Sequence, residues 1–260
     1  MQRLAEIAPG VLVATAEFAM TTSTVVTAPD GACLVIDPAV SVADLAGLAA
    51  DLAGAGLRPQ VGFATHPHWD HVLWSADLGD VPRYAAPKGV AIMPEVRAAS
   101  VERVEAEAPG HDLALFGQLV ALPADRAVIP WDGPVARVIV HDGHAPGHGA
   151  VFLPDAGVLV AGDMLSDVEM PLLDYEAADP LGDYRAGLER LASVAGVGLL
   201  VPGHGHVGDG AEFRRRVEAD LRYLDLLAAG QPFDDPRAAD GWLLDWHQRQ
   251  LARVAGRGAG

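Results

Sequence analysis

The stretch THPHWDH, residues 65–71, places three histidines and one aspartate within six positions, directly after an apolar run that is typical of a buried strand. Side chains two residues apart in an extended chain point to the same side. Pro67 keeps His66 extended, because the residue before a proline is pushed out of the helical region. His66 and His68 can therefore reach the same metal ion.

Asp70 and His71 follow where the chain turns into VLWSADL, so their side chains leave in a different direction. Asp70 could instead cap a following helix, and a lone H-x-H pair could be a satisfied polar group at a strand end. The complete H-x-H-x-D-H pattern after a buried strand favours metal binding over these alternatives. One short segment can then supply ligands to two neighbouring ions.

The rest of the chain alternates strands and helices, and its two halves echo each other. In residues 34–66 and again in 159–204, a strand ending in aspartate precedes a helix and then a strand ending in histidine, which hints at two similar half-domains that face each other. Strands are expected at 11–18 and 21–28, joined as a hairpin, and at 32–37, 61–65, 136–142, 150–155, 157–163 and 198–202. Helices are expected at 41–54 (opened by a Ser41–Asp44 capping box), 94–108, 180–191 (with Asp179 as N-cap), 210–229 and about 240–255.

Composition bounds the class of protein. The 260 residues are half hydrophobic, enough for one large domain or two small ones, and carry a formal net charge of -17, which disfavours nucleic acid as a partner. Neither a secretory signal nor a membrane-length apolar stretch is visible, so a soluble cytoplasmic protein without a membrane partner is expected. The single cysteine, Cys33, lies in an apolar run and is expected to be buried and inert. Any metal must therefore be held by nitrogen and oxygen.

Further candidate ligands occur in matching contexts. The tetrapeptide PGHG is found at 146–149 and again at 202–205, so that His148 and His204 each follow a Pro-Gly turn beside an expected strand. Asp163 ends the strand at 157–163, where an unpaired buried carboxylate would be costly. Either histidine alone could be a structural turn residue, but their shared setting favours a metal site.

This set of motifs resembles the metallo-β-lactamase fold superfamily over residues 11 to about 210. The resemblance implies an α/β fold, a four-layer αββα sandwich of two facing mixed β-sheets with outer helices, formed as a single domain by residues 1–260. It also implies that His66, His68 and His148 hold a first metal, that Asp70, His71 and His204 hold a second, and that Asp163 bridges the two.

The chemistry follows from those ligands. Imidazole and carboxylate suit zinc, with iron and manganese also compatible, so two Zn²⁺ per chain are expected. Two such ions about 3.5–4 Å apart can share a hydroxide and polarise a carbonyl, while Asp70 would orient the hydroxide or return a proton to the leaving group. We therefore expect a metal-dependent hydrolase of a small lactone, ester or thioester, similar to lactonases and glyoxalase-II-like thioesterases.

Other members of the superfamily provide alternatives. One is a mononuclear iron oxidoreductase resembling persulfide dioxygenases, and another is a non-catalytic ligand-binding relative, against which the intact ligand set argues. The resemblance disfavours a true β-lactamase, because those enzymes lack a bridging carboxylate such as Asp163, and the charge disfavours a nuclease.

Several residues near the motifs are candidates for supporting roles. Trp69 either walls an apolar substrate pocket or packs at a helix start, and packing is preferred for Trp74. His144 is expected to orient a ligand or a turn by hydrogen bonding. His206 either touches substrate or lies on the surface. Tyr175 is preferred over Tyr184, which sits at core spacing on a helix, as a group that polarises a carbonyl.

Two irregular segments, near 87–134 and 164–180, are candidates for a substrate-facing lid. The acidic residues of 164–180 (Asp167, Glu169, Asp174 and Glu176) are expected to form a solvated face. The apolar C-terminal helix, with Trp242 and Trp246, could pack on the core or on a second subunit, which leaves a homodimer open.

Overall fold

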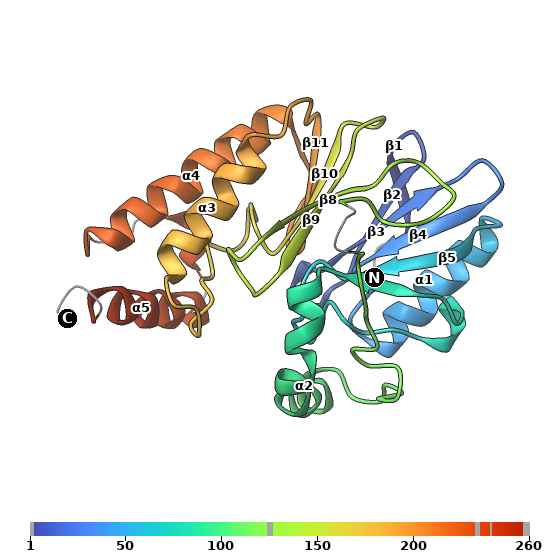
Figure 1. Cartoon of the computed structure of the whole chain (residues 1–260), viewed down its shortest axis with the longest axis horizontal. Coiled ribbons are helices and arrows are strands. Elements are labelled where there is room, and N and C mark those ends of the chain that lie inside the picture. The colour runs from blue at the N-terminus through green and yellow to red at the C-terminus, as the bar shows by residue number, and fades with distance from the viewer. Residues whose placement is uncertain (1–2, 124–126, 232–234, 240, 257–260) are drawn as a thin grey trace.

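The computed structural model of the chain describes residues 3–123, 127–231, 235–239 and 241–256. Its centre is a pair of β-sheets, one of seven strands in the order β1-β2-β3-β4-β5-β6-β7 and one of five in the order β12-β11-β10-β9-β8. Figure 1 shows α1 and α2 on the outer side of the first sheet, and α3 and α4, with α5 beside them, on the outer side of the second. Each sheet contains both parallel and antiparallel neighbours. The expected αββα sandwich of two facing mixed sheets is confirmed.

The elements have the following bounds. The first sheet contains β1 (Ala5–Ala8), β2 (Val11–Thr15), β3 (Thr22–Thr27), β4 (Ala32–Ile36), β5 (Arg58–Phe63), β6 (Arg83–Ala85) and β7 (Val120–Ala121). The second contains β8 (Arg137–His141), β9 (His148–Leu153), β10 (Val158–Gly162), β11 (Leu199–Pro202) and β12 (Gly208–Asp209). The helices are α1 (Val42–Gly54), α2 (Pro87–Glu107), α3 (Pro180–Ala192), α4 (Gly210–Ala228) and α5 (Gly241–Ala255), with short 3-10 turns η1 (Phe18–Met20), η2 (Ala76–Leu78) and η3 (Pro236–Ala239).

Local sequence signals explain several of these boundaries. β2 and β3 pair antiparallel as the expected hairpin, with Val11 opposite Val26. At the start of α1 the Ser41 hydroxyl accepts the Asp44 N–H and donates to the Asp44 carboxylate, which is a reciprocal cap. Asp179 caps α3 by accepting the Gly182 N–H, directly before a proline at the first helical position.

The echo between the two halves is present in three dimensions. β4–α1–β5 and β10–α3–β11 are both parallel strand–helix–strand units. Asp37 follows β4 and Asp163 follows β10, and the loops after β5 and β11 carry the histidine motifs. The two sheets are joined at this edge, where the Thr22 N–H donates to the Gly203 carbonyl at 2.8 Å. Candidate ligands from both halves are thereby brought to one edge, at the carboxyl ends of parallel strands, where α/β sheets place their sites.

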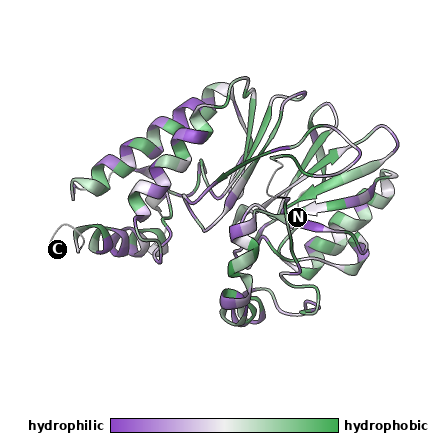
Figure 2. Cartoon of the chain, in the orientation of Figure 1, coloured by the Kyte–Doolittle hydropathy of each residue, from purple (hydrophilic) through white to green (hydrophobic). Residues whose placement is uncertain are grey.

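The hydrophobic core lies between the layers. Both faces of β4, β9 and β10 are buried, because one face of each strand meets the other sheet and the opposite face meets helices. Figure 2 shows these strands as largely hydrophobic. Cys33 is fully buried within this packing, as expected. Among the described residues, the helices are too short or too polar to cross a membrane.

One helix differs from expectation. The helix expected at 94–108 begins seven residues earlier, at Pro87 in its first turn, and Pro94 lies inside it. Proline at the first helical position costs nothing because that N–H has no helical partner, whereas an internal proline removes one hydrogen bond. A large part of the irregular segment 87–134 is therefore regular helix, while residues 124–126 of that segment and Asp240 at the expected helix start lie outside the described residues.

Candidate metal centre

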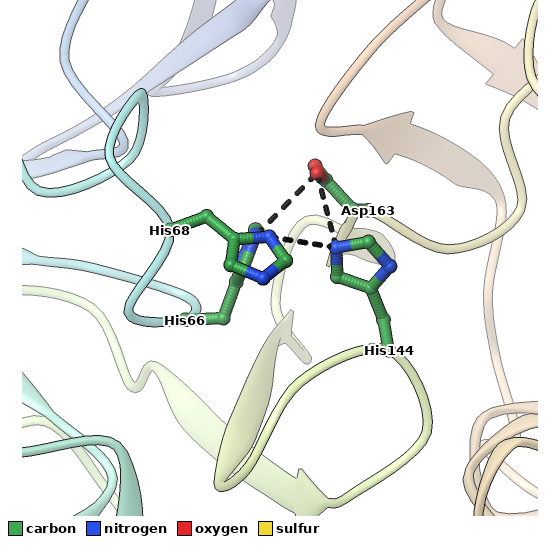
Figure 3. Close-up of side chains that lie close together, drawn as sticks. All are labelled: His66, His68, His144 and Asp163. Atoms are coloured by element: carbon green, nitrogen blue, oxygen red, sulfur yellow. Dashed lines mark hydrogen bonds and ion pairs between the residues drawn. The ribbon is translucent and has the colours of Figure 1, made fainter. Parts of the chain in front are cut away.

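Four side chains converge in a first group at the joined edge of the sheets (Figure 3). His66 and His68 come from the loop after β5, His144 from the turn between β8 and β9, and Asp163 from the end of β10. The His68 Nδ1 lies 3.0 Å from the His66 Nε2 and 2.9 Å from the His144 Nε2. The Asp163 Oδ2 lies 3.4 Å from the His66 Nε2 and 3.5 Å from the His144 Nε2. One oxygen and three nitrogens thus face a common point.

A second group lies directly beside the first. It consists of Asp70, His71 and His204. The His204 Nε2 lies 3.4 Å from both the His71 Nε2 and the Asp70 Oδ2. Asp163 reaches this group as well, with Oδ1 3.0 Å from the His71 Nε2 and Oδ2 3.3 Å from the His204 Nε2. Asp163 is therefore the side chain that both groups share.

The outer ring nitrogens of these histidines are tied to protein oxygens. The His144 Nδ1 lies 2.8 Å from the Leu172 carbonyl, and the His204 Nδ1 lies 3.0 Å from the Ala19 carbonyl. Because a carbonyl oxygen only accepts, each Nδ1 carries the hydrogen and each Nε2 turns its lone pair toward the cluster. In the neutral form of His144 and of His204, the inward nitrogen is therefore free to bind a metal ion.

Asp37 organises the motif from behind. Its carboxylate accepts the Thr65 N–H at 2.8 Å and the Thr65 hydroxyl at 2.7 Å, and it lies 3.0 Å from the His71 Nδ1. Since the Thr65 hydroxyl donates to Asp37, it is left to accept from the His66 Nδ1, 3.0 Å away. Asp37 thus orients one histidine of each group. Sequence analysis missed this role, although the aspartate that ends β4 was visible as the counterpart of Asp163.

The donor set fits divalent metal ions. The three imidazole nitrogens of the first group are about 3 Å from one another along the His66–His68–His144 chain, and all three can turn lone pairs inward together only if a cation lies between them. Nitrogens about 2.0–2.1 Å from a tetrahedral zinc would be roughly 3.3 Å apart, close to the spacing of this group. The second group supplies two nitrogens and the Asp70 carboxylate, with Asp163 completing it.

The electrostatics agree with this fit. Burial, reinforced by the neighbouring His144, lowers the pKa of His68 to about 3, so its ring is a neutral ligand. Burial by itself would raise the pKa of Asp163, but His204 and His71 outweigh it and hold the pKa well below its usual range. His68 is therefore a neutral imidazole beside an ionised carboxylate, which are the protonation states that metal binding requires. Burial would lower the pKa of His71 and of His204, but Asp163 outweighs it and holds both well above the usual range, so a metal ion would displace protons from these two rings.

The structure corrects the assignment of His148 and His144. His148 is the first residue of β9 and lies behind the cluster, where its ring stacks at 5.0 Å on His66 and at 4.5 Å on His141. Neither ring nitrogen of His148 has a hydrogen-bond partner among the described residues. His144 is not an outer partner of a ligand but itself faces the first group. The sequence offered two Gly-His pairs four residues apart, and only the path of the turn before β9 decides which one points inward.

A cavity of about 540 Å³ opens onto both groups. Trp69 lines it and packs edge-to-face on Phe18, with ring centroids 5.4 Å apart. Tyr175 lines it too, but its hydroxyl donates to the Trp246 carbonyl at 3.1 Å, so it presents its ring rather than a free hydroxyl. The Tyr175 hydroxyl hydrogen is therefore already engaged and does not point at a substrate carbonyl, as the expected polarising role would require.

Other expected neighbours lie elsewhere. His206 is outside the cavity, with its side chain 65% exposed and its Nδ1 2.8 Å from the Asp167 carboxylate, so the surface alternative for His206 fits. Trp74 is buried and donates to the Gly79 carbonyl, and Tyr184 is buried in the core under α3. Glu169 and Asp174 line the cavity, whereas a solvated face was expected for the acidic residues of 164–180.

Comparison with known proteins agrees with this geometry. A probable metallo-hydrolase of Bacillus subtilis (strain 168) is 27% identical over 186 residues, which cover 62% of this chain and 70% of that protein. A hydroxyacylglutathione hydrolase of Acidiphilium cryptum (strain JF-5) is 29% identical over 220 residues, 81% of this chain and 78% of that protein. The crystal structure of a metallo-beta-lactamase family protein from Thermus thermophilus superposes with a TM-score of 0.66 and 24% identity, covering 96% of this chain and 91% of that one.

The family model named for the metallo-beta-lactamase superfamily matches residues 16–222. That span contains both candidate metal-binding groups, Asp163 between them, and the two parallel units that carry them. The chain belongs to the metallo-β-lactamase superfamily.

Proposed function

We propose that the protein is a dinuclear metallo-hydrolase, with two zinc ions, that cleaves the acyl bond of a small lactone, ester or thioester. The observation that carries this proposal is the position of Asp163, whose two oxygens lie within 3.5 Å of histidine nitrogens from both groups. Two relatives with hydrolase names support the reaction class.

We assign the candidate ligands to two metal ions according to the two groups described above. His66, His68 and His144 would hold one ion, Asp70, His71 and His204 the other, and Asp163 both. Bound there, two divalent ions would supply a Lewis acid for the carbonyl and a water of lowered pKa. Because both groups are complete, this arrangement favours a dinuclear hydrolase over the mononuclear iron oxidoreductase and over a silent binding protein.

Asp70 contributes more than ligation. It lines the cavity, and His71 and His204 hold the pKa of its carboxyl below the usual range although burial opposes this. As an ionised carboxylate, Asp70 can accept a hydrogen bond from the attacking water and orient it toward the substrate carbonyl. Water then adds its oxygen to the acyl carbon, the C–O or C–S bond breaks, and a proton passes to the leaving oxygen or sulfur.

The test combines metal analysis with a hydrolysis screen. Mass spectrometry of the purified protein should find about two zinc ions per chain, and a panel of lactones, thioesters, phosphoesters and β-lactams should show turnover of the first two classes. A His66→Ala/His68→Ala variant should lose metal and turnover while retaining its circular dichroism spectrum. One bound iron with oxygen uptake, or full turnover by the metal-free variant, would overturn the proposal.

A further inference from the structure

The cavity beside the candidate metal centre has mainly apolar walls. Its volume of about 540 Å³ is in the range of small-molecule sites. Its floor is formed by candidate metal ligands, and the remaining lining is dominated by aromatic and leucine side chains. The aromatic side chains include Phe18, Trp69, Trp242 and Trp246.

Two aromatic pairs form the walls, one from each half of the chain. Phe18 and Trp69 pack edge-to-face with centroids 5.4 Å apart, and Tyr175 and Trp246 pack edge-to-face at 5.0 Å. Such pairs hold each ring in a fixed orientation. The rings are therefore a preformed apolar surface, and Trp242 adds a side chain that is 49% exposed.

α5 is fixed to the segment that follows the metal centre. Gln250 is buried, accepts the Leu173 N–H at 2.7 Å and donates to the Pro171 carbonyl at 3.1 Å. The Arg253 Nε donates to the Tyr175 carbonyl at 3.0 Å. These bonds make α5 and residues 171–175 one wall, so the position of Trp242 and Trp246 relative to the metal centre is set by the fold.

Outside the candidate metal ligands, the cavity offers little positive charge to an anionic substrate. Apart from the candidate ligands, Glu169 and Asp174 line it, and Arg103 is the one cation among the described lining residues. The Arg103 side chain is 61% exposed and lies 3.6 Å from the Glu107 carboxylate. The one lysine of the chain, Lys88, pairs with Asp142 away from the cavity. A glutathione thioester, which carries two carboxylates and one ammonium group, would find only Arg103 among these outer lining residues to pair with its carboxylates.

We propose that this cavity selects an uncharged substrate with an apolar acyl group, of medium chain length or aromatic, and that Trp242 and Trp246 of α5 determine this selectivity. The proposal rests on the proposed hydrolase function and deepens it. It predicts that substrates with a glutathione leaving group are poor, although one relative of the chain bears the name hydroxyacylglutathione hydrolase.

Hydrolysis by the zinc-loaded protein tests the selectivity. Neutral octanoyl and phenylacetyl esters should exceed the matching acetyl ester in kcat/KM by at least about tenfold, which is the rate equivalent of burying one or two methylene groups. The glutathione thioester of octanoate should be slower than the octanoyl thioester of a neutral thiol. Trp242→Ala should reduce the octanoyl-to-acetyl ratio about tenfold, and Trp242→Phe should restore part of it.

Leu244→Ala is the matched control, because Leu244 is an exposed apolar residue of the same helix that does not line the cavity. It should leave the ratio unchanged. Equal rates for acetyl and octanoyl esters, or a preference for the glutathione thioester, would overturn the selectivity while the hydrolase proposal stands.

Binding of octanamide, measured by calorimetry, separates the two proposals. This neutral amide should bind to the wild-type protein and about tenfold more weakly to Trp242→Ala, whether or not any ester is cleaved. Failure of octanamide to bind would overturn the inference. Binding without hydrolysis of any carbonyl substrate would overturn the hydrolase function alone.

Discussion

Exchanging His144 and His148 for phenylalanine, one at a time, separates a metal ligand from a packing residue. The His144 Nε2 faces the first group, 2.9 Å from the His68 Nδ1. His148 stacks between His66 and His141 and offers neither nitrogen to the group. Phenylalanine keeps an aromatic ring and removes both nitrogens, so the same change probes two different roles.

The two variants are expected to differ in metal content. His144→Phe should reduce the metal content from about two ions per chain to one, and should weaken the first site by more than about 100-fold, since loss of an outer-shell partner alone costs 10–100-fold. At His148 the relief of two unpaired buried nitrogens, about 1–3 kcal/mol, opposes the crowding of a larger ring, also about 1–3 kcal/mol. His148→Phe should therefore retain both ions with a small change in stability.

The backbone of Gly162 is where a larger ring at position 148 would be crowded. Gly162 adopts a φ of 57°, and a Cβ there would lie 2.5 Å from the His148 Nε2, so the ring already packs against that backbone. Metal content is measured by mass spectrometry after dialysis, and affinity by competition with a chromophoric chelator. Loss of an ion from His148→Phe, together with two retained ions in His144→Phe, would refute the assignment of His144.

Four other outcomes are expected. Asp37→Asn should weaken metal binding about 10–100-fold in chelator competition, because the carboxylate orients one histidine of each group. Asp70→Ala should abolish hydrolysis while circular dichroism shows an intact fold, and retained turnover would contradict its role in orienting water. Arg237→Ala should lower the free energy of unfolding, measured by urea denaturation, by about 3–5 kcal/mol, because it leaves the buried Asp220 carboxylate without the guanidinium 2.5 Å away. As a control, Arg185→Ala removes one partner of an exposed ion pair and should lower it by less than about 1 kcal/mol. Chelator treatment should lower Tm, because an ion at 1,000 times its Kd stabilises the fold by about 4 kcal/mol, and an unchanged Tm would mean that no ion binds the folded state.

Much of the fold and centre was predictable because it rests on local rules. Alternating and continuous apolar runs indicated the strands, and Ser41 and Asp179 marked two helix starts. Pro67 and the spacing of His66 and His68 predicted ligands on one side of an extended segment, and these two side chains do face one point. Neighbouring residues determine all of these features through backbone sterics and hydrogen bonds.

Three features required the tertiary structure. The inward position of His144 rather than His148 depends on how the turn between β8 and β9 passes the loop after β5. The role of Asp37 depends on the parallel pairing of β4 and β5, which brings its carboxylate to Thr65 across 28 residues of chain.

The substrate cavity depends on α5 docking against residues 171–175 through Gln250. Sequence patterns specify which way a side chain leaves its own segment, and so the sequence by itself determined the strands, the helices and the motif. Which segments meet is set by packing between distant parts of the chain, and so only the tertiary structure decided which side chains face the candidate metal centre and which form the walls around it.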